Sequence, residues 1–117
     1  MPNKERKKEL IRAYKESPKT IGVYCIRNLQ NHKIYVGISQ DVEARINRHR
    51  FELNNNSERE LQELQSDWQT SGHEAFEFSV LAQMQPENEE DVETWLDTQY
   101  LNWCEKLQSM VPNGYNP

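Results

Sequence analysis

Two short apolar segments joined by a tight turn, with a helical segment directly behind them, constrain this chain more than any other feature. Residues 20–28 and 33–39 are rich in β-branched and aromatic side chains, which favour strands. Because only residues 29–32 separate them, the two strands are expected to pair as an antiparallel hairpin. Residues 41–54 then carry apolar side chains at helical spacing, so a helix should follow the hairpin.

One more strand and three more helices are expected around this hairpin. Residues 3–16 predict a short basic helix, and residues 57–60 have the pattern of a capping box that opens a helix. Residues 75–81 alternate apolar and polar side chains, as a third strand would, and residues 89–107 predict a last helix with an acidic first turn. We therefore expect an α/β fold, a small three-stranded antiparallel sheet flanked by helices, with an extra N-terminal helix.

Length and composition fit one globular domain. The chain has 117 residues, of which 35% are hydrophobic and 28% charged. We divide it into a basic N-terminal arm, residues 1–19, and one domain, residues 20–117. Cys25 and Cys104 are isolated thiols, and neither a signal-peptide core nor an apolar run of membrane-spanning length is apparent. These features predict two buried cysteines in a cytoplasmic protein without a membrane partner.

Charge is distributed unevenly along the chain. The formal net charge of −5 by itself argues against a nucleic-acid-binding protein. Residues 1–19, however, hold seven Lys and Arg against three Asp and Glu, and a second basic group lies within residues 45–50. Acidic side chains gather within residues 87–97, where a solvated helix face explains them as well as a functional role does. The candidate phosphate contacts are Lys7, Lys8, Gly37 and Arg48.

Four side chains in and behind the hairpin could handle a phosphate and a water. They are Tyr24 and Tyr35 on the strands, with Arg45 and His49 one helical turn apart on the helix. Taken singly, each is most simply a strand aromatic, a surface arginine or a satisfied histidine. Gly37 has no Cβ, so a ligand or a backbone could approach it closely. Whether both tyrosines lie on one face of the sheet depends on the strand register.

The order and spacing of these residues resemble the GIY-YIG nuclease superfamily. The segment Gly22-Val23-Tyr24 stands where the family has Gly-Ile-Tyr, and Tyr35-Val36-Gly37 stands where it has Tyr-Ile-Gly. Arg45, eight residues after Gly37, is in the position of the family's arginine, and His49 is in that of its common histidine. Each tripeptide alone would be weak support, so the joint order carries the resemblance.

The C-terminal part of the chain extends this resemblance. Residues 76–81 look like the third strand of the family, and Asn113-Gly114-Tyr115-Asn116 is similar to the terminal motif of phage intron-encoded homing endonucleases. The resemblance covers residues 20–116 and so nearly all of the chain beyond the predicted arm. It implies a protein encoded by a bacterium or a phage.

The resemblance implies a divalent-metal-dependent DNA endonuclease that hydrolyses phosphodiester bonds. Arg45 would balance the charge that develops on the phosphoryl oxygens. Tyr24 would position or deprotonate the attacking water, which requires nearby cations because free tyrosine is a poor base at neutral pH. Tyr35 and His49 would order water and phosphate, and Asn116 would tie the C-terminus into the site. One Mg²⁺ or Mn²⁺ ion per site would stabilise the leaving oxygen.

The acidic metal ligand departs from the family pattern. An alignment of residues 96–101 with the family pattern places Asp97 where glutamate is usual, and Glu93 lies one turn earlier on the same helix face. Aspartate is shorter than glutamate by one methylene, or roughly 1.5 Å. A misplacement of about 1 Å can reduce the rate on the order of a hundredfold. We therefore predict Asp97 as the metal ligand, with assistance from Glu93.

Site selection has no obvious source in this sequence. Relatives that cut chosen sites usually carry a separate DNA-recognition domain, and none is expected within residues 1–117. Specificity would then come from the basic arm, from residues 54–68, from a homodimer or from a separate recognition protein. Two alternatives therefore stay open. The chain could be a catalytically weak or silent module that binds DNA or protein, or a catalytic subunit that needs a recognition partner.

Overall fold

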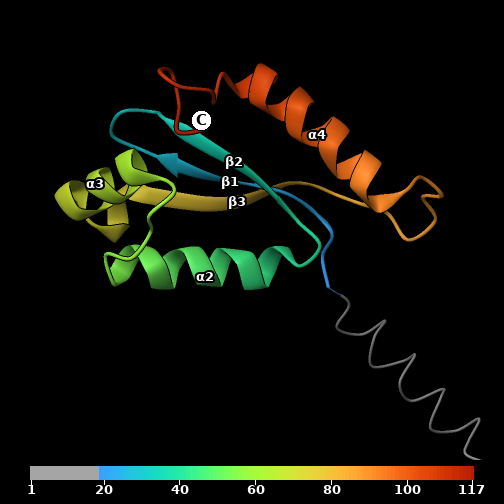
Figure 1. Ribbon diagram of the computed structural model, residues 1–117, viewed down its shortest axis with the longest axis horizontal. Coiled ribbons are helices and arrows are strands. Elements are labelled where there is room, and N and C mark those ends of the chain that lie inside the picture. The colour runs from blue at the N-terminus through green and yellow to red at the C-terminus, as the bar shows by residue number, and fades with distance from the viewer. Residues whose placement is uncertain (1–18) are drawn as a thin grey trace, which may run out of the picture.

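The computed structural model describes residues 19–117 (Figure 1). The predicted hairpin, the helix behind it and the third strand are all present, whereas the predicted N-terminal helix, with Lys7 and Lys8, lies outside the described residues. In chain order the elements are β1 (Gly22–Asn28), β2 (Ile34–Ser39), α2 (Val42–Asn54), α3 (Gln62–Ser71), a 3-10 turn (His73–Ala75), β3 (Phe76–Gln83) and α4 (Val92–Leu107). None of the helices in this part of the chain is long and apolar enough to cross a membrane.

The strands form one antiparallel sheet in the order β2-β1-β3, so β1 is central and β2 is an edge strand. Along the β1–β2 hairpin, Tyr24 lies opposite Gly37 and Ile26 lies opposite Tyr35. Residues directly opposite each other on antiparallel strands project to the same face. Tyr24 and Tyr35 therefore share one face of the sheet, and the α/β fold with a three-stranded antiparallel sheet is confirmed.

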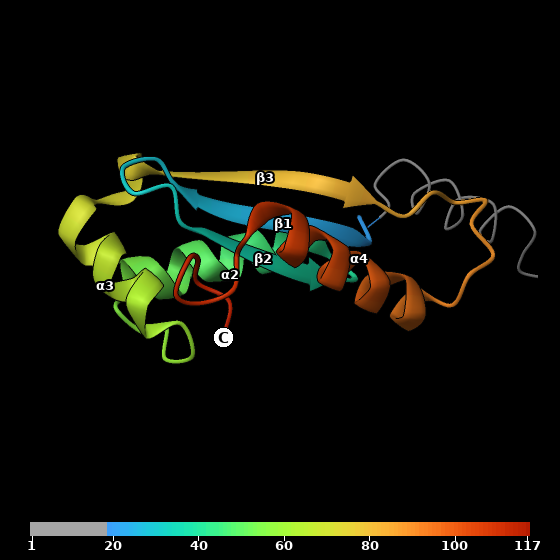
Figure 2. The ribbon, with the colours of Figure 1, turned by 90° about the horizontal axis from the view of Figure 1, so that it is seen from above.

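Helices cover both faces of this sheet. In Figure 1 the sheet lies between α2 below and α4 above, and α3 lies at the end of the molecule near the β1–β2 turn. Seen from above, α4 runs over β2, with the C-terminus close by (Figure 2). Tyr24 and Ile26 face α2 and α3, whereas Val23 and Cys25 face α4. The alternation of a strand thus sends the tyrosines and the α4-packing residues to opposite sides.

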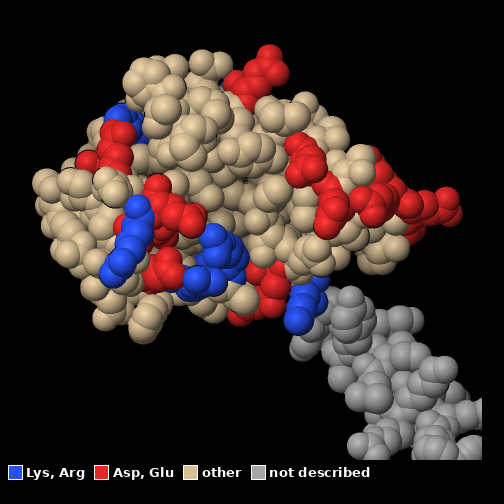
Figure 3. Space-filling view, viewed as in Figure 1, with Lys and Arg blue, Asp and Glu red and all other residues tan. Residues whose placement is uncertain are grey.

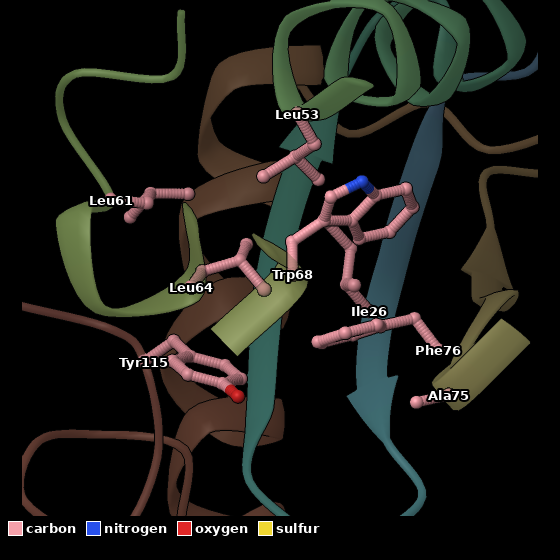
Figure 4. Packing of buried hydrophobic residues seen from close by; sticks show 8 residues of the cluster. All are labelled: Ile26, Leu53, Leu61, Leu64, Trp68, Ala75, Phe76 and Tyr115. Atoms are coloured by element: carbon pink, nitrogen blue, oxygen red, sulfur yellow. The ribbon is translucent and has the colours of Figure 1, made fainter. Parts of the chain in front are cut away.

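The larger core lies between α2, α3 and the tyrosine face of the sheet (Figure 4). Leu53 and Leu64 are fully buried there, and the rings of Trp68 and Phe76 are 5.0 Å apart. Burial of each such side chain contributes roughly 1.5–3 kcal/mol. The cluster comprises Ile26, Leu53, Leu61, Leu64, Trp68, Ala75, Phe76 and Tyr115. This core fixes the end of α2 against the sheet and so positions the residues that α2 carries.

A second core joins α4 to the opposite face. Cys104 of α4 packs with Val23, Cys25 and Val36, and Tyr100 and Trp103 lie at its margin. Both cysteines are buried free thiols, as the sequence predicts. The packing holds α4 along β2, the strand that carries Tyr35.

The C-terminal turn closes the outer edge of β2. The side chain of Asn116 accepts a hydrogen bond from Val36 N (2.8 Å) and donates one to Val36 O (2.9 Å). The backbone N–H of Tyr115 donates to Ile34 O at 3.0 Å. Gly114 lies so close to the Ser109 backbone that a Cβ there would overlap it. The Asn113-Gly114-Tyr115-Asn116 motif therefore acts as a short substitute for a neighbouring strand.

The predicted capping box at residues 57–60 is wrong. The α3 helix begins at Gln62, and Leu61 precedes it without a side-chain cap. Glu58 is buried, and its backbone N–H donates to Gln65 Oε1 at 3.0 Å. This residue therefore belongs to the protein interior and not to a helix cap. The last helix also begins later than predicted, at Val92, because Asp91 is its N-cap and accepts a hydrogen bond from Thr94 N.

Candidate active site

Tyr24 and Tyr35 lie side by side on the sheet face that α2 covers. Their ring centroids are 6.3 Å apart, and Tyr24 is 1% exposed. A Cβ at Gly37 would overlap the phenol ring of Tyr24. The glycine predicted as a phosphate contact thus lies under the Tyr24 ring, and its missing side chain is what allows that ring to reach α2.

His49 of α2 faces both tyrosines. Its Nε2 lies 2.7 Å from the Tyr24 hydroxyl, and its ring centroid is 5.6 Å from each tyrosine ring. The side chain is 2% exposed, so it is a core residue, although the sequence places it at the border of the apolar stripe. The structure therefore brings Tyr24, Tyr35 and His49 into one compact group.

Arg45 lies one turn before His49 and completes the group. Its half-buried guanidinium lies beside the Tyr24 hydroxyl and close to Tyr35. Arg48, on the next turn, is exposed and donates from Nε to Glu52 Oε1 at 2.9 Å. Only Arg45 of these two arginines is thus directed to the tyrosines, as the helical spacing of four residues to His49 predicts.

Burial controls the protonation of the group. It raises the pKa of Tyr24, with the neighbouring Tyr35 adding to the rise and Arg45 opposing it. Burial, followed by Arg45, lowers the pKa of His49 to about 4. At neutral pH the site therefore holds a neutral phenol and a neutral imidazole, and the positive charge next to them is that of Arg45.

A buried carboxylate that no sequence pattern pointed to also lies in the site. Glu58 Oε2 is 3.4 Å from His49 Nδ1, on the side of the ring away from Tyr24. Burial, followed by the nearby carboxylate of Glu52, raises the pKa of Glu58. Its position in a loop gave no periodic signal, and the capping pattern concealed it. The one sign of Glu58 in the sequence was that an acidic residue lies in the segment that leads from α2 back to the core.

On the α4 side the structure brings a tyrosine, not a carboxylate, to the group. The hydroxyl of Tyr100 accepts a hydrogen bond from Asn116 Nδ2 at 3.2 Å, and Tyr100 lies near Tyr35. Asp97 and Glu93 are exposed on the preceding turns of α4. Within residues 19–117 neither carboxylate makes a side-chain hydrogen bond or an ion pair with the tyrosine group. Asn116 is 1% exposed and connects β2 to Tyr100, so it braces the site.

The carboxylates near the site suit a divalent ion only if water and substrate supply most of its ligands. No group of three His, Cys, Asp or Glu side chains within residues 19–117 is arranged to hold a metal. Mg²⁺, however, usually keeps several waters and binds proteins through one or two carboxylates together with substrate phosphates. Asp97 and Glu93 are exposed hard-oxygen donors of that kind, so they suit an ion that arrives with water and phosphate.

The charges outside the site are unevenly distributed. Figure 3 shows Asp and Glu side chains gathered at the end of the molecule where α4 begins, which corresponds to the acidic segment at residues 87–97. Lys and Arg side chains lie among Asp and Glu over α2. A polyanion would meet less repulsion over α2 than at the start of α4.

The arrangement can bind and polarise an anion next to a proton acceptor. Arg45 offers a planar set of donors to phosphoryl oxygens. The Tyr24 hydroxyl beside it is hydrogen-bonded to a neutral imidazole, which can accept a proton. Phosphoryl transfer needs little more from a protein than positioning, charge stabilisation and proton transfer.

Comparisons with a family model, with a curated protein and with solved structures all point to one family. The family model described as GIY-YIG catalytic domain matches residues 20–110. Intron-associated endonuclease 1 of Enterobacteria phage T4 is 33% identical over 95 residues, which make up 81% of this chain. The chain thus spans only 36% of the length of that relative.

Two solved structures of the catalytic domain of the homing endonuclease I-TevI, one of them a mutant, share the fold. Their TM-scores are 0.69 and 0.67, with sequence identities of 31% and 30%. Each match covers 83% of this chain, and 92% and 96% of the respective I-TevI chains. The family resemblance inferred from the sequence is confirmed, and the chain belongs to the GIY-YIG family as a nuclease catalytic domain.

Proposed function

We propose that this domain hydrolyses DNA phosphodiester bonds with Tyr24, Arg45 and His49 as its central residues. The observation that carries the proposal is the 2.7 Å contact between the Tyr24 hydroxyl and His49 Nε2, with Arg45 beside it. Family membership and the homing endonucleases among the similar proteins support DNA as the substrate. Because the chain spans 36% of the length of its phage relative, we assign cleavage alone to this domain.

Each residue has a role that its surroundings support. Arg45 binds the scissile phosphate and balances the charge of the transition state. Tyr24 orients the attacking water and passes a proton toward His49. Tyr35 lies beside Tyr24 and near Tyr100 of α4, and it orders water and phosphate there. Arg48 is exposed and contacts a neighbouring phosphate, which adds affinity without sequence preference.

The proposed reaction also uses one Mg²⁺ or Mn²⁺ ion, for which Asp97 is the proposed ligand and Glu93 the assisting one. When bound, the ion supplies Lewis-acid stabilisation to the phosphate and the leaving oxygen. The exposure of both carboxylates supports their access to a hydrated ion and to substrate.

A second candidate function follows from Tyr100. The α4 residue that contacts the site is this tyrosine, and the carboxylates lie on the turns before it. If the ion needs a carboxylate at that place, the domain is a GIY-YIG-derived module that binds DNA or protein without cutting. Binding by such a module would not respond to a chelator.

A plasmid-nicking assay at low salt separates these functions. Wild type, Arg45→Ala and Asp97→Asn are compared with Mg²⁺, Mn²⁺ or EDTA, with circular dichroism as the control for folding. We expect metal-dependent nicking by wild type and a loss on the order of a hundredfold or more in both variants. If folded wild type shows no nicking with Mg²⁺ or with Mn²⁺, the nuclease proposal is refuted and the binding module is favoured.

A further inference from the structure

Glu58, His49 and Tyr24 form a row of three buried side chains. Glu58 is 9% exposed and places Oε2 3.4 Å from His49 Nδ1. The opposite ring nitrogen, Nε2, is 2.7 Å from the Tyr24 hydroxyl. The carboxylate comes from the loop before α3, the imidazole from α2 and the phenol from β1, so only the tertiary fold brings them together.

His49 Nδ1 needs the partner that Glu58 offers. It is a buried nitrogen without a hydrogen bond among the described residues, although the carboxylate oxygen is within 3.4 Å. A buried polar atom left unsatisfied costs about 1–3 kcal/mol. A small closing movement of Glu58 would convert this contact into a hydrogen bond and remove that cost.

The fold holds Glu58 where such a movement is short. Its backbone N–H donates to Gln65 Oε1 at 3.0 Å, and Gln65 Nε2 in turn donates to Leu53 O at 3.0 Å. Gln65 therefore clamps the loop between the end of α2 and the first turns of α3. An acidic side chain that served only solubility would not be buried and anchored in this way.

The groups that face this row define its protonation. Tyr24 comes from β1, Tyr35 from β2, and Arg45, Arg48 and Glu52 from α2. The pKa of His49 is lowered to about 4, chiefly by burial, so the ring carries one proton near neutral pH. Burial and Glu52 raise the pKa of Glu58, so it loses its acceptor role at a higher pH than a free glutamate would.

We propose that Glu58 is a positioning residue for the reaction, holding the proton of His49 on Nδ1 so that Nε2 accepts from the Tyr24 hydroxyl. This inference rests on the proposed function. As water attacks the phosphorus, it gives a proton to the Tyr24 oxygen, and Tyr24 gives its own proton to Nε2. The new P–O bond forms, the bond to the leaving oxygen breaks, and that oxygen takes a proton from solvent. The imidazolium that results lies next to the Glu58 carboxylate, and it returns its proton to solvent afterwards.

Two substitutions at Glu58 separate positioning from packing. Glu58→Leu fills the site without an acceptor, whereas Glu58→Gln keeps an acceptor oxygen and removes the charge. Glu60→Gln, two residues on and exposed, is the matched control. The readouts are the pH dependence of plasmid nicking and the His49 tautomer, which long-range ¹H–¹⁵N NMR reports in the protein alone.

We expect wild type to show the Nδ1–H tautomer and an activity that falls with decreasing pH as Glu58 becomes protonated. Glu58→Leu should shift His49 to the Nε2–H tautomer and reduce nicking about a hundredfold. Glu58→Gln should nick more slowly than wild type, because its amide can also donate to Nδ1 and favour the wrong tautomer, and it should lose the pH dependence that Glu58 causes. Glu60→Gln should change none of these.

The proposal is overturned if Glu58→Leu keeps the wild-type tautomer, rate and pH profile. If Glu58→Leu fails to fold, an unchanged pH profile in Glu58→Gln overturns it equally. If wild type does not cut DNA at all, the proposed function fails, and the tautomer of His49 in wild type and in the variants still decides whether Glu58 positions the ring.

Discussion

The two sides of the tyrosine group differ in how firmly the fold fixes them. On the α2 side, Tyr24, His49 and Glu58 are buried. The Tyr24 hydroxyl is 2.7 Å from His49 Nε2, and His49 Nδ1 is 3.4 Å from Glu58 Oε2. On the α4 side, Asp97 and Glu93 are exposed, and within residues 19–117 the hydrogen bond from Asn116 to Tyr100 is the one polar contact between α4 and the site. The proton-transfer side is thus preorganised, whereas the proposed metal side is left for water, ion and substrate to complete. Preorganisation matters most where a displacement of about 1 Å is costly.

The largest expected effect tests the α2 side. Tyr24→Phe removes the hydroxyl that contacts His49 and Arg45 and is expected to reduce the nicking rate about 10²- to 10³-fold. Tyr35→Phe is the matched control, because Tyr35 makes no hydrogen bond to His49 among residues 19–117. We expect Tyr35→Phe to reduce the nicking rate roughly tenfold or less. If both variants reduce the single-turnover rate equally, the two hydroxyls contribute equally to cleavage and the special role of Tyr24 is contradicted.

The next effect concerns stability against pH. The pKa of His49 falls from 6.5 to about 4 on folding, so the unfolded chain binds the proton more readily between these values. The stability due to neutral His49 is therefore complete above pH 6.5 and is lost as the pH falls toward 4. The full loss is on the order of 3 kcal/mol. Glu58, with its raised pKa, acts in the opposite direction and reduces the net slope.

Urea unfolding at intervals from pH 7 to pH 4.5 measures this slope. His49→Gln should flatten it, because the substituted side chain does not titrate. A variant with the wild-type slope would show that another group causes the pH dependence.

A smaller effect is expected at the brace between the two sides. Asn116→Ala removes the hydrogen bonds to Val36 N, Val36 O and Tyr100 Oη and should lower the free energy of unfolding by about 2 kcal/mol. Asn113→Ala, in the same turn but exposed, should change it by about 0.5 kcal/mol or less. Equal values for both variants in urea unfolding would contradict the bracing role.

The smallest expected effect tests the proposed ion ligand Asp97 on the α4 side. If Asp97 holds the ion at the end of a short side chain, Asp97→Glu should raise nicking or lower the Mg²⁺ concentration needed, by roughly tenfold. Mg²⁺ titrations of the nicking rate measure it. Reduced activity would mean that the site is built around aspartate, and no change would remove Asp97 from the proposed ligands.

The sequence predicted those parts of the fold and site that depend on local spacing. The hairpin follows from two apolar segments with a short turn, and the sharing of one helix face by Arg45 and His49 follows from their spacing of four residues. Whether Tyr24 and Tyr35 share a face required the register, since a shift of one residue would reverse it.

Glu58 and Tyr100 could not be predicted because long-range packing decides their orientation. The Gln65 side chain turns residue 58 inward, against its capping pattern. The contacts of Cys104 and Trp103 with the sheet fix the rotation of α4, and that rotation directs Tyr100, not Asp97, toward Asn116. Helical periodicity alone offers both residues as candidates, since they are three positions apart.

The strand-like pairing of the C-terminal turn also bears on how copies of the chain behave at high concentration. An uncovered edge strand offers its N–H and C=O groups to the edge of another molecule, which is a route to aggregation. Here one carboxamide and one backbone amide already occupy Val36 N, Val36 O and Ile34 O. The turn that braces the site therefore also protects β2 from intermolecular pairing, so solubility and site geometry depend on the same few hydrogen bonds.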